Sequence, residues 1–121
     1  SSTAYAAMIE AMDSAVGTVL AALDELDLAS ETLVIFTSDN GAYGGVTDLS
    51  PLREAKGHLY EGGIRVPLIV RWPGHVEAGT VSDVPVISMD FLPTILEAIG
   101  ATAGPEEILD GESLVPVLTG T

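Results

Sequence analysis

A continuous apolar and β-branched run, Thr32–Thr37, ends abruptly in the polar sequence Ser38-Asp39-Asn40-Gly41. A run of this kind, without polar alternation, is typical of a strand that is buried on both faces, and such strands occur mainly in parallel sheets. Proteins with parallel sheets bind their ligands beyond the carboxyl ends of the strands. The run therefore predicts an α/β protein with a functional site at Asp39 and Asn40.

Helical and strand-like patterns lie on both sides of this run. Apolar residues at i, i+3, i+4 and i+7 predict an amphipathic helix over residues 4–27. Further along, the sequence predicts a second buried strand, a short strand, a helix that Asp90 caps, and a terminal helix, at Val66–Arg71, Val84–Ser88, Asp90–Ile99 and Glu112–Leu118. This alternation of helices and strands again indicates the α/β class.

Positive charge is scarce in the chain and is confined to one region. The protein has 18 acidic and 4 basic residues, and all the basic ones fall between positions 53 and 71: Arg53, Lys56, Arg65 and Arg71. Much of that region belongs to a glycine-rich, aperiodic loop, residues 41–63, and loops of this length are usually functional. Basic residues gathered after a carboxylate–amide pair indicate a site that handles an anion near a metal ion.

Composition excludes several classes of protein. The 121 residues are 47% apolar, enough for the core of one domain or part of one. A net charge of −14 makes nucleic acid a poor partner and disfavours anionic membrane surfaces. The absence of cysteine excludes disulfides, thiolate metal sites and a cysteine nucleophile among these residues. No uninterrupted apolar run approaches the roughly 18 residues of a membrane span.

Asp39 and Asn40 place carboxylate and amide oxygens at adjacent positions where the predicted strand ends. Hard divalent cations such as Ca²⁺ and Mg²⁺ prefer oxygen ligands of this kind. Two residues cannot complete six or more coordination positions, so further ligands would have to come from elsewhere. A simple Asp-Asn-Gly turn, without a metal, is the alternative interpretation.

The loop offers three further candidates for chemistry. Lys56 is the only lysine in the chain, and its compact charge suits an anionic oxygen of a substrate; otherwise it is a solvated loop residue. His58 is either a proton donor or substrate contact, or a polar residue without a role. Arg53 either binds an anion or pairs with the acidic surface. Glu61 and Arg65, four residues apart, are expected to form a buried structural ion pair.

Taken together, these motifs resemble the sulfatase family of the alkaline-phosphatase-like superfamily. The resemblance covers nearly the whole chain in order, at Met12–Gly17, Thr32–Gly41, Lys56–Pro67, Trp72–Gly74, Asp90–Leu96 and Asp110–Leu114. It implies a three-layer α/β/α sandwich, represented here by a partial sheet with flanking helices. It also implies that residues 1–121 are a single partial catalytic domain, the later portion of a longer one.

The resemblance also implies roles for particular residues. Asp39 and Asn40 are expected to bind a divalent cation, usually Ca²⁺, and Lys56 to contact the sulfate. The family hydrolyses sulfate esters with a formylglycine nucleophile, made from Cys or Ser in a C/S-x-P-x-R sequence near the start of the domain. That sequence is absent here. The chain by itself is therefore expected not to hydrolyse sulfate esters, and to bind calcium only weakly.

Other functions remain open at this point. One is a phosphodiesterase or phosphonate hydrolase of the same superfamily, and another is a non-catalytic α/β module that binds a metal or a partner protein. For a sulfatase, the expected partner is a sulfated small molecule or glycan, and the family resemblance suggests a periplasmic or secreted location. Uncovered strands and apolar faces in a partial sheet also predict self-association.

Overall fold

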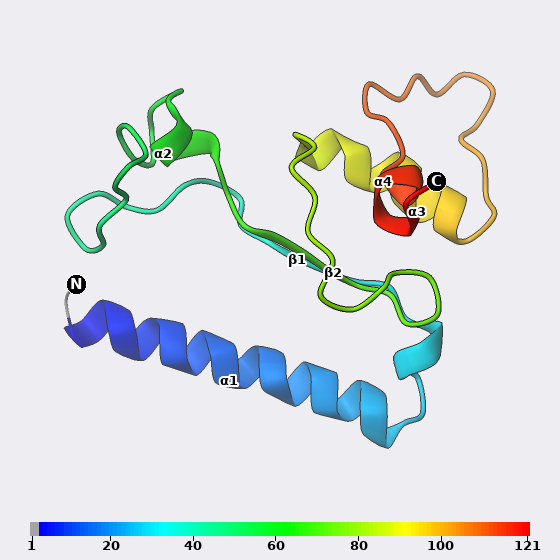
Figure 1. The fold of residues 1–121 in the computed structure, drawn as a ribbon, viewed down its shortest axis with the longest axis horizontal. Helices are drawn as coiled ribbons and strands as arrows, with labels where there is room; N and C mark the ends of the chain where they lie inside the picture. The colour runs from blue at the N-terminus through cyan, green and yellow to red at the C-terminus, as the bar shows by residue number, and fades with distance from the viewer. Residues whose placement is uncertain (1–2) are drawn as a thin grey trace. The chain divides into compact units, whose positions relative to one another are not determined.

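The computed structural model describes residues 3–121, which divide into two compact units, residues 3–73 and 74–121 (Figure 1). The first unit contains a long helix, a 3₁₀ turn, two strands and a short helix: α1 (Thr3–Glu25), η1 (Ala29–Glu31), β1 (Val34–Thr37), α2 (Glu61–Ile64) and β2 (Leu68–Arg71). The second unit contains a 3₁₀ turn and two helices: η2 (Ser88–Asp90), α3 (Phe91–Ala98) and α4 (Val115–Thr119).

The amphipathic pattern correctly predicts α1, but its apolar side chains are not covered. No residue of α1 is buried, and Met8 and Val19 are 68% and 60% exposed. Within the described range 3–121, α1 is the one helix that is long and apolar enough to cross a membrane by length and mean hydropathy. Polar residues interrupt the apolar sequence of α1, so this helix contains no uninterrupted apolar run of that length. A core helix of a soluble protein and a signal sequence meet the same criteria.

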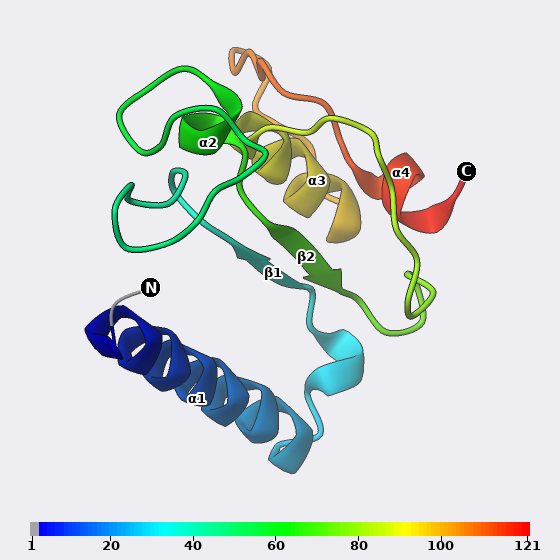
Figure 2. The ribbon, with the colours of Figure 1, turned by 60° about the vertical axis from the view of Figure 1, so that its left-hand side comes forward.

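The two strands pair antiparallel, in register from Val34 opposite Arg71 to Thr37 opposite Leu68 (Figure 2). The expected parallel arrangement is wrong for this pair. The connection through residues 38–67 returns the chain to the end at which β1 finished, whereas a parallel pairing needs a crossover to the opposite end. Burial on both faces was also wrong, since β1 is only half-buried along its length.

The short strand expected at Val84–Ser88 does not form, and these residues are exposed and without regular secondary structure up to the start of η2. Pro85 lies in the middle of this segment and has no N–H to donate to a neighbouring strand. The helix expected at Asp90–Ile99 does form, as α3. It ends at Ala98, two residues before Gly100, whose φ of 67° is the left-handed conformation that commonly terminates helices.

The second unit is built around the side chains of Asp90 and Thr94, which are 9% and 1% exposed. Asp90 accepts hydrogen bonds from the backbone N–H groups of Ile87 (2.8 Å) and Glu112 (3.0 Å). Thr94 Oγ1 accepts from the N–H of Leu114 (2.8 Å) and donates to the carbonyl of Asp90 (2.6 Å). We call these two residues the Asp90–Thr94 clamp, because they fasten residues 112–114 to α3.

The clamp explains two differences from the sequence expectations. Asp90 precedes α3, but its carboxylate makes no capping bond to that helix and accepts from Ile87 and Glu112 instead. The terminal helix begins at Val115 rather than Glu112, because the clamp engages the N–H groups of Glu112 and Leu114. The hydrogen bonds from Ile87 and Glu112 lower the pKa of Asp90, and burial opposes them only in part.

Candidate functional site

Asp39 and Asn40 lie immediately beyond the carboxyl end of β1, as the sequence predicts. The side-chain amide of Asn40 donates to Oδ1 of Asp39 at 2.8 Å, and Ser38 Oγ donates to the Asn40 carbonyl at 2.9 Å. Asp39 is exposed and Asn40 is half-buried. The hydrogen bond between the two side chains does not engage Oδ2 of Asp39 or Oδ1 of Asn40, so these oxygens remain for another ligand.

The available oxygens of Asp39 and Asn40 are of the type that a hard divalent cation prefers, but they are too few to complete its coordination sphere. Both available side-chain atoms are oxygens, which Ca²⁺ and Mg²⁺ prefer. No group of three or more His, Cys, Asp or Glu residues suited to a metal occurs in the described part of the chain. Asp39 and Asn40 can therefore supply part of a coordination sphere that needs six or more oxygens.

Three buried glycines, Gly41, Gly62 and Gly63, hold the long loop against the end of β1. The N–H of Gly41 donates to the carbonyl of Gly63, and that of Gly62 to the carbonyl of Arg53, both at 2.8 Å. A Cβ on Gly41 would overlap the carbonyl of Gly62, and one on Gly62 would overlap the carbonyl of Glu54. Only glycine permits this approach of main chain to main chain. We call these three residues the glycine interlock.

The loop brings the main chain of Lys56 next to the segment that carries Asp39 and Asn40. The N–H of Lys56 donates to the carbonyl of Ala42 at 2.9 Å, and Ala42 follows Asn40 by two positions. The Lys56 side chain is exposed. Lys56 and Ala42, fourteen positions apart in the sequence, are thus joined by one direct backbone contact, and the glycine interlock joins the same two segments.

His58 lies in the same loop and contacts its immediate neighbours. Its Nδ1 is 3.3 Å from the carbonyl of Ala55, and its Nε2 is 3.8 Å from Oε2 of Glu54. The His58 side chain is 56% exposed, which leaves the ring accessible to a ligand. Glu54 has a φ of 61°, an unusual left-handed conformation for a residue with a long side chain. Sequence patterns gave no sign of this strained position.

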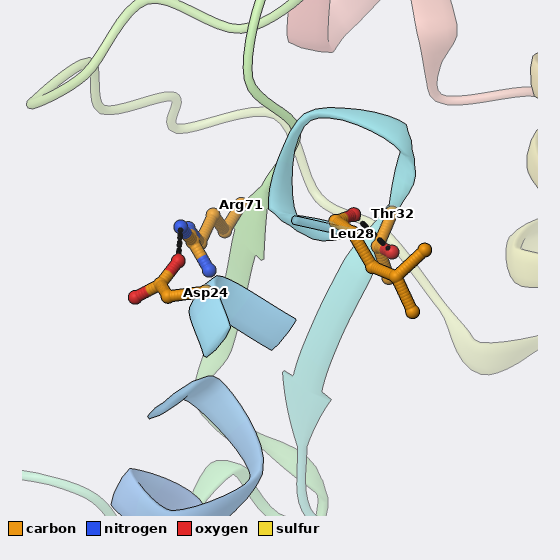
Figure 3. Close-up of polar contacts among 4 residues, drawn as sticks. All are labelled: Asp24, Leu28, Thr32 and Arg71. Carbon is orange, nitrogen blue, oxygen red and sulfur yellow. Dashed lines mark hydrogen bonds and ion pairs between the residues drawn. The ribbon is translucent and has the colours of Figure 1, made fainter. Parts of the chain in front are cut away.

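Arg71 has a structural role in the first unit. Its guanidinium pairs with Asp24 at 3.2 Å and ties the end of α1 to the end of β2 (Figure 3). In the connection between α1 and β1, Thr32 Oγ1 donates to the carbonyl of Leu28 at 2.7 Å (Figure 3). Arg71 is therefore unlike a ligand-binding cation, because a carboxylate of its own chain already neutralises it.

The remaining basic residues divide into paired and unpaired. Arg65 forms the predicted ion pair with Glu61, at 3.0 Å, but the expected burial is wrong, since both side chains are at least 60% exposed. Glycines rather than charged groups occupy the buried part of this turn. The guanidinium carbon of Arg53 lies 3.8 Å from the centroid of the Tyr60 ring, a contact that the sequence did not reveal. Within residues 3–121, Lys56 is in none of the ion pairs.

Comparison with known proteins decides the family. The family model described as Sulfatase matches residues 1–101. The chain belongs to the sulfatase family. Steryl-sulfatase of Mus musculus is 45% identical to this sulfatase chain over 128 residues, which cover 97% of the chain and 20% of the relative. The matched region includes α1, so α1 belongs to the part that sulfatases share.

Solved sulfatase structures confirm the predicted fold class, the alkaline-phosphatase-like α/β/α type. The structure of Ps i-CgsB in complex with k-i-k-neocarrahexaose has a TM-score of 0.87 at 38% identity, over 93% of this chain and 25% of that one. That of BT4656 in complex with its substrate D-glucosamine-2-N,6-O-disulfate has a TM-score of 0.77 at 32% identity, over 92% and 21%. The chain thus spans a quarter or less of the length of these relatives.

Proposed function

We propose that residues 1–121 supply one part of the catalytic domain of a sulfate-ester hydrolase. The observation that carries the proposal is the hydrogen bond from the Lys56 N–H to the Ala42 carbonyl. In a chain of the sulfatase family, it brings the main chain of the only lysine next to the segment that carries Asp39 and Asn40. An unpaired ammonium and a set of oxygen donors are the two features that recognition of a sulfate near a cation requires.

Each side chain has a distinct role in this proposal. Lys56 donates to an oxygen of the sulfate and neutralises the negative charge that develops on it in the transition state. Asp39 and Asn40 would hold a divalent cation, with Ca²⁺ as the proposed ion. When bound, such a cation polarises the sulfate and lowers the pKa of a hydroxyl nucleophile. His58, exposed in the same loop, donates a proton to the leaving oxygen or contacts the organic part of the substrate.

The nucleophile in this proposal is a formylglycine that these 121 residues do not supply, since they contain no C/S-x-P-x-R sequence. The proposed substrate is a sulfate ester of a small molecule or a glycan. Support for this breadth comes from relatives named as a steryl-sulfatase and as a protein in complex with a disulfated glucosamine.

Replacing Lys56 tests the proposal in the longest natural form of the protein. We expect Lys56→Ala to lower kcat on an aryl sulfate by about 10²–10³-fold, because charge stabilisation in the transition state is lost. Arg65→Ala is the matched control, a change to an exposed cation of the same segment that is already paired with Glu61, and its kcat should stay within about twofold. Unchanged turnover in Lys56→Ala would rule the role out.

A cation requirement is tested separately. We expect a chelator to abolish turnover and added Ca²⁺ to restore it, with Asn40→Ala raising the Ca²⁺ concentration needed for half-maximal activity. Calorimetry with Ca²⁺ alone should show weaker binding to Asn40→Ala than to the parent protein. Activity on phosphate diesters but not on sulfate esters would instead favour the phosphodiesterase alternative.

We also infer that these 121 residues self-associate when isolated. The exposed apolar side chains of α1, among them Met8 and Val19, support this inference, because burying such surface is favourable in water. The net charge of −14 opposes it, so association should strengthen as salt screens the repulsion. Light scattering that finds only monomers at high protein and salt concentrations would contradict it.

A further inference from the structure

The four basic residues of this chain differ in whether they form ion pairs within it. Arg65 and Arg71 each pair with a carboxylate of their own chain. Arg53 and Lys56, three residues apart in the loop, take part in none of the ion pairs among the described residues 3–121. In a protein with 18 acidic residues, partners for a surface cation are plentiful. Arg53 and Lys56 have no carboxylate partner among the described residues, so both are open to an anion from outside the chain.

Arg53 is also held in a defined position. Its guanidinium lies over the ring of Tyr60, 3.8 Å from the centroid, and its carbonyl accepts a hydrogen bond from Gly62 at 2.8 Å. A guanidinium stacked on a ring keeps the N–H groups of its edges available, and these match the two oxygens of a sulfate or carboxylate. Because stacking limits the motion of the long side chain, less entropy is lost when an anion binds.

Both cations are attached to the glycine interlock. The N–H of Gly62 donates to the carbonyl of Arg53. The N–H of Gly41 donates to the carbonyl of Gly63, and the neighbouring residue Ala42 accepts from the N–H of Lys56. The loop therefore carries both Arg53 and Lys56 on main chain that backbone hydrogen bonds hold in place. The proposed function assigns only Lys56, to the sulfate that is hydrolysed.

We propose that Arg53, stacked on Tyr60, forms a subsite for a second anionic group of the substrate. The ligand class is a saccharide that carries a sulfate or carboxylate in addition to the sulfate ester at Lys56. This inference rests on the proposed function. It adds a preference for substrates with two anionic groups, which Arg53 recognises without contact with the reacting bond.

The test compares substrates with one and two anionic groups in the longest natural form of the protein. The probes are D-glucosamine-2-N,6-O-disulfate and the two corresponding monosulfates. For Arg53→Ala we expect kcat/KM to fall about tenfold on the disulfate, through a higher KM, and less than twofold on a hydrolysed monosulfate. Arg53→Lys keeps the positive charge but lacks the planar guanidinium, so its kcat/KM on the disulfate should lie between those of the parent and Arg53→Ala. An equal loss on both substrates, or no loss, would overturn the inference.

Binding measured without turnover separates this inference from the proposed function. Titration calorimetry with the disulfate should show affinity about tenfold weaker for Arg53→Ala, and unchanged for the control Arg65→Ala. If the parent protein hydrolyses neither these probes nor an aryl sulfate, the proposed function fails, and the binding comparison still decides on Arg53. Equal affinity of Arg53→Ala and the parent, or no binding by either, refutes the subsite.

Discussion

Two irregular stretches of this chain are held by opposite means. The loop 41–63 is fastened by the glycine interlock, where main chain meets main chain with no side chain between. Residues 112–114 are fastened by the Asp90–Thr94 clamp, where buried polar side chains bind backbone N–H groups. In the loop, the side chains of Arg53, Lys56 and His58 remain exposed. A backbone-held loop thus leaves its side chains available for a ligand, whereas the clamp uses its side chains for structure.

Adding a methyl group to the glycine interlock should have the largest effect. In Gly62→Ala, the new Cβ would overlap the carbonyl of Glu54, so the loop must move, and we expect the free energy of unfolding to fall by about 3 kcal/mol. Urea denaturation followed by the fluorescence of Trp72, the single tryptophan, measures it. The matched control is Gly17→Ala in α1, where a Cβ meets nothing within 4 Å. This control should gain about 0.5–1 kcal/mol. Equal effects would show that the interlock is not tightly packed.

Removing the hydroxyl of Thr94 breaks the other fastening. Thr94→Val keeps the shape but leaves the buried N–H of Leu114 without its acceptor, so we expect a loss of about 2 kcal/mol in the free energy of unfolding. Faster amide hydrogen exchange at Leu114 should accompany it. Thr18→Val in α1, which removes an exposed hydroxyl, should change stability by less than about 0.5 kcal/mol.

Acid should distinguish the two fastenings, because only the clamp contains a carboxylate. The pKa of Asp90 is lower in the folded protein than its usual value of 3.8, so its contribution to stability is fully present above that value and is lost as the pH falls through the folded pKa. We expect Asp90→Asn to be less stable at neutral pH, and the difference from the parent to shrink below about pH 4. A difference that is constant between pH 6 and pH 2 would contradict this assignment.

The smallest expected effect is a gain at Glu54. Because its φ of 61° is strained for a residue with a Cβ, we expect Glu54→Gly to raise the free energy of unfolding by up to about 1 kcal/mol. Glu25→Gly, in the last turn of α1, should instead lower it by a similar amount. Destabilisation by Glu54→Gly would mean that its contact with His58 outweighs the strain.

Local patterns predicted the elements near the site well. The apolar run gives β1, the 3.6-residue period gives α1, and the polar sequence that follows the run places Asp39 and Asn40 at a strand end. These features depend on residues close in sequence, which is why one chain suffices to find them. The role of Lys56 remains a prediction, and the structure adds the backbone contact with Ala42 that supports it.

Local sequence patterns did not predict the features that depend on tertiary contacts. The start of α4 depends on hydrogen bonds from Glu112 and Leu114 to side chains about twenty residues earlier. The stacking of Arg53 on Tyr60 follows no period in the sequence, and the strained φ of Glu54 depends on how closely the loop packs. None of these contacts has a signature in the local sequence, so only the tertiary structure reveals them.

Motif order, periodicity and charge are properties of the chain alone, so they were enough to predict the family, the α/β class and the candidate residues. The antiparallel direction of β2, the ion pairs of Arg65 and Arg71, and the approach of the Lys56 main chain to the segment after β1 follow only from the tertiary structure. These depend on which distant main-chain groups find one another. In the loop, glycines at positions 41, 62 and 63 permit that meeting by having no side chain to prevent it.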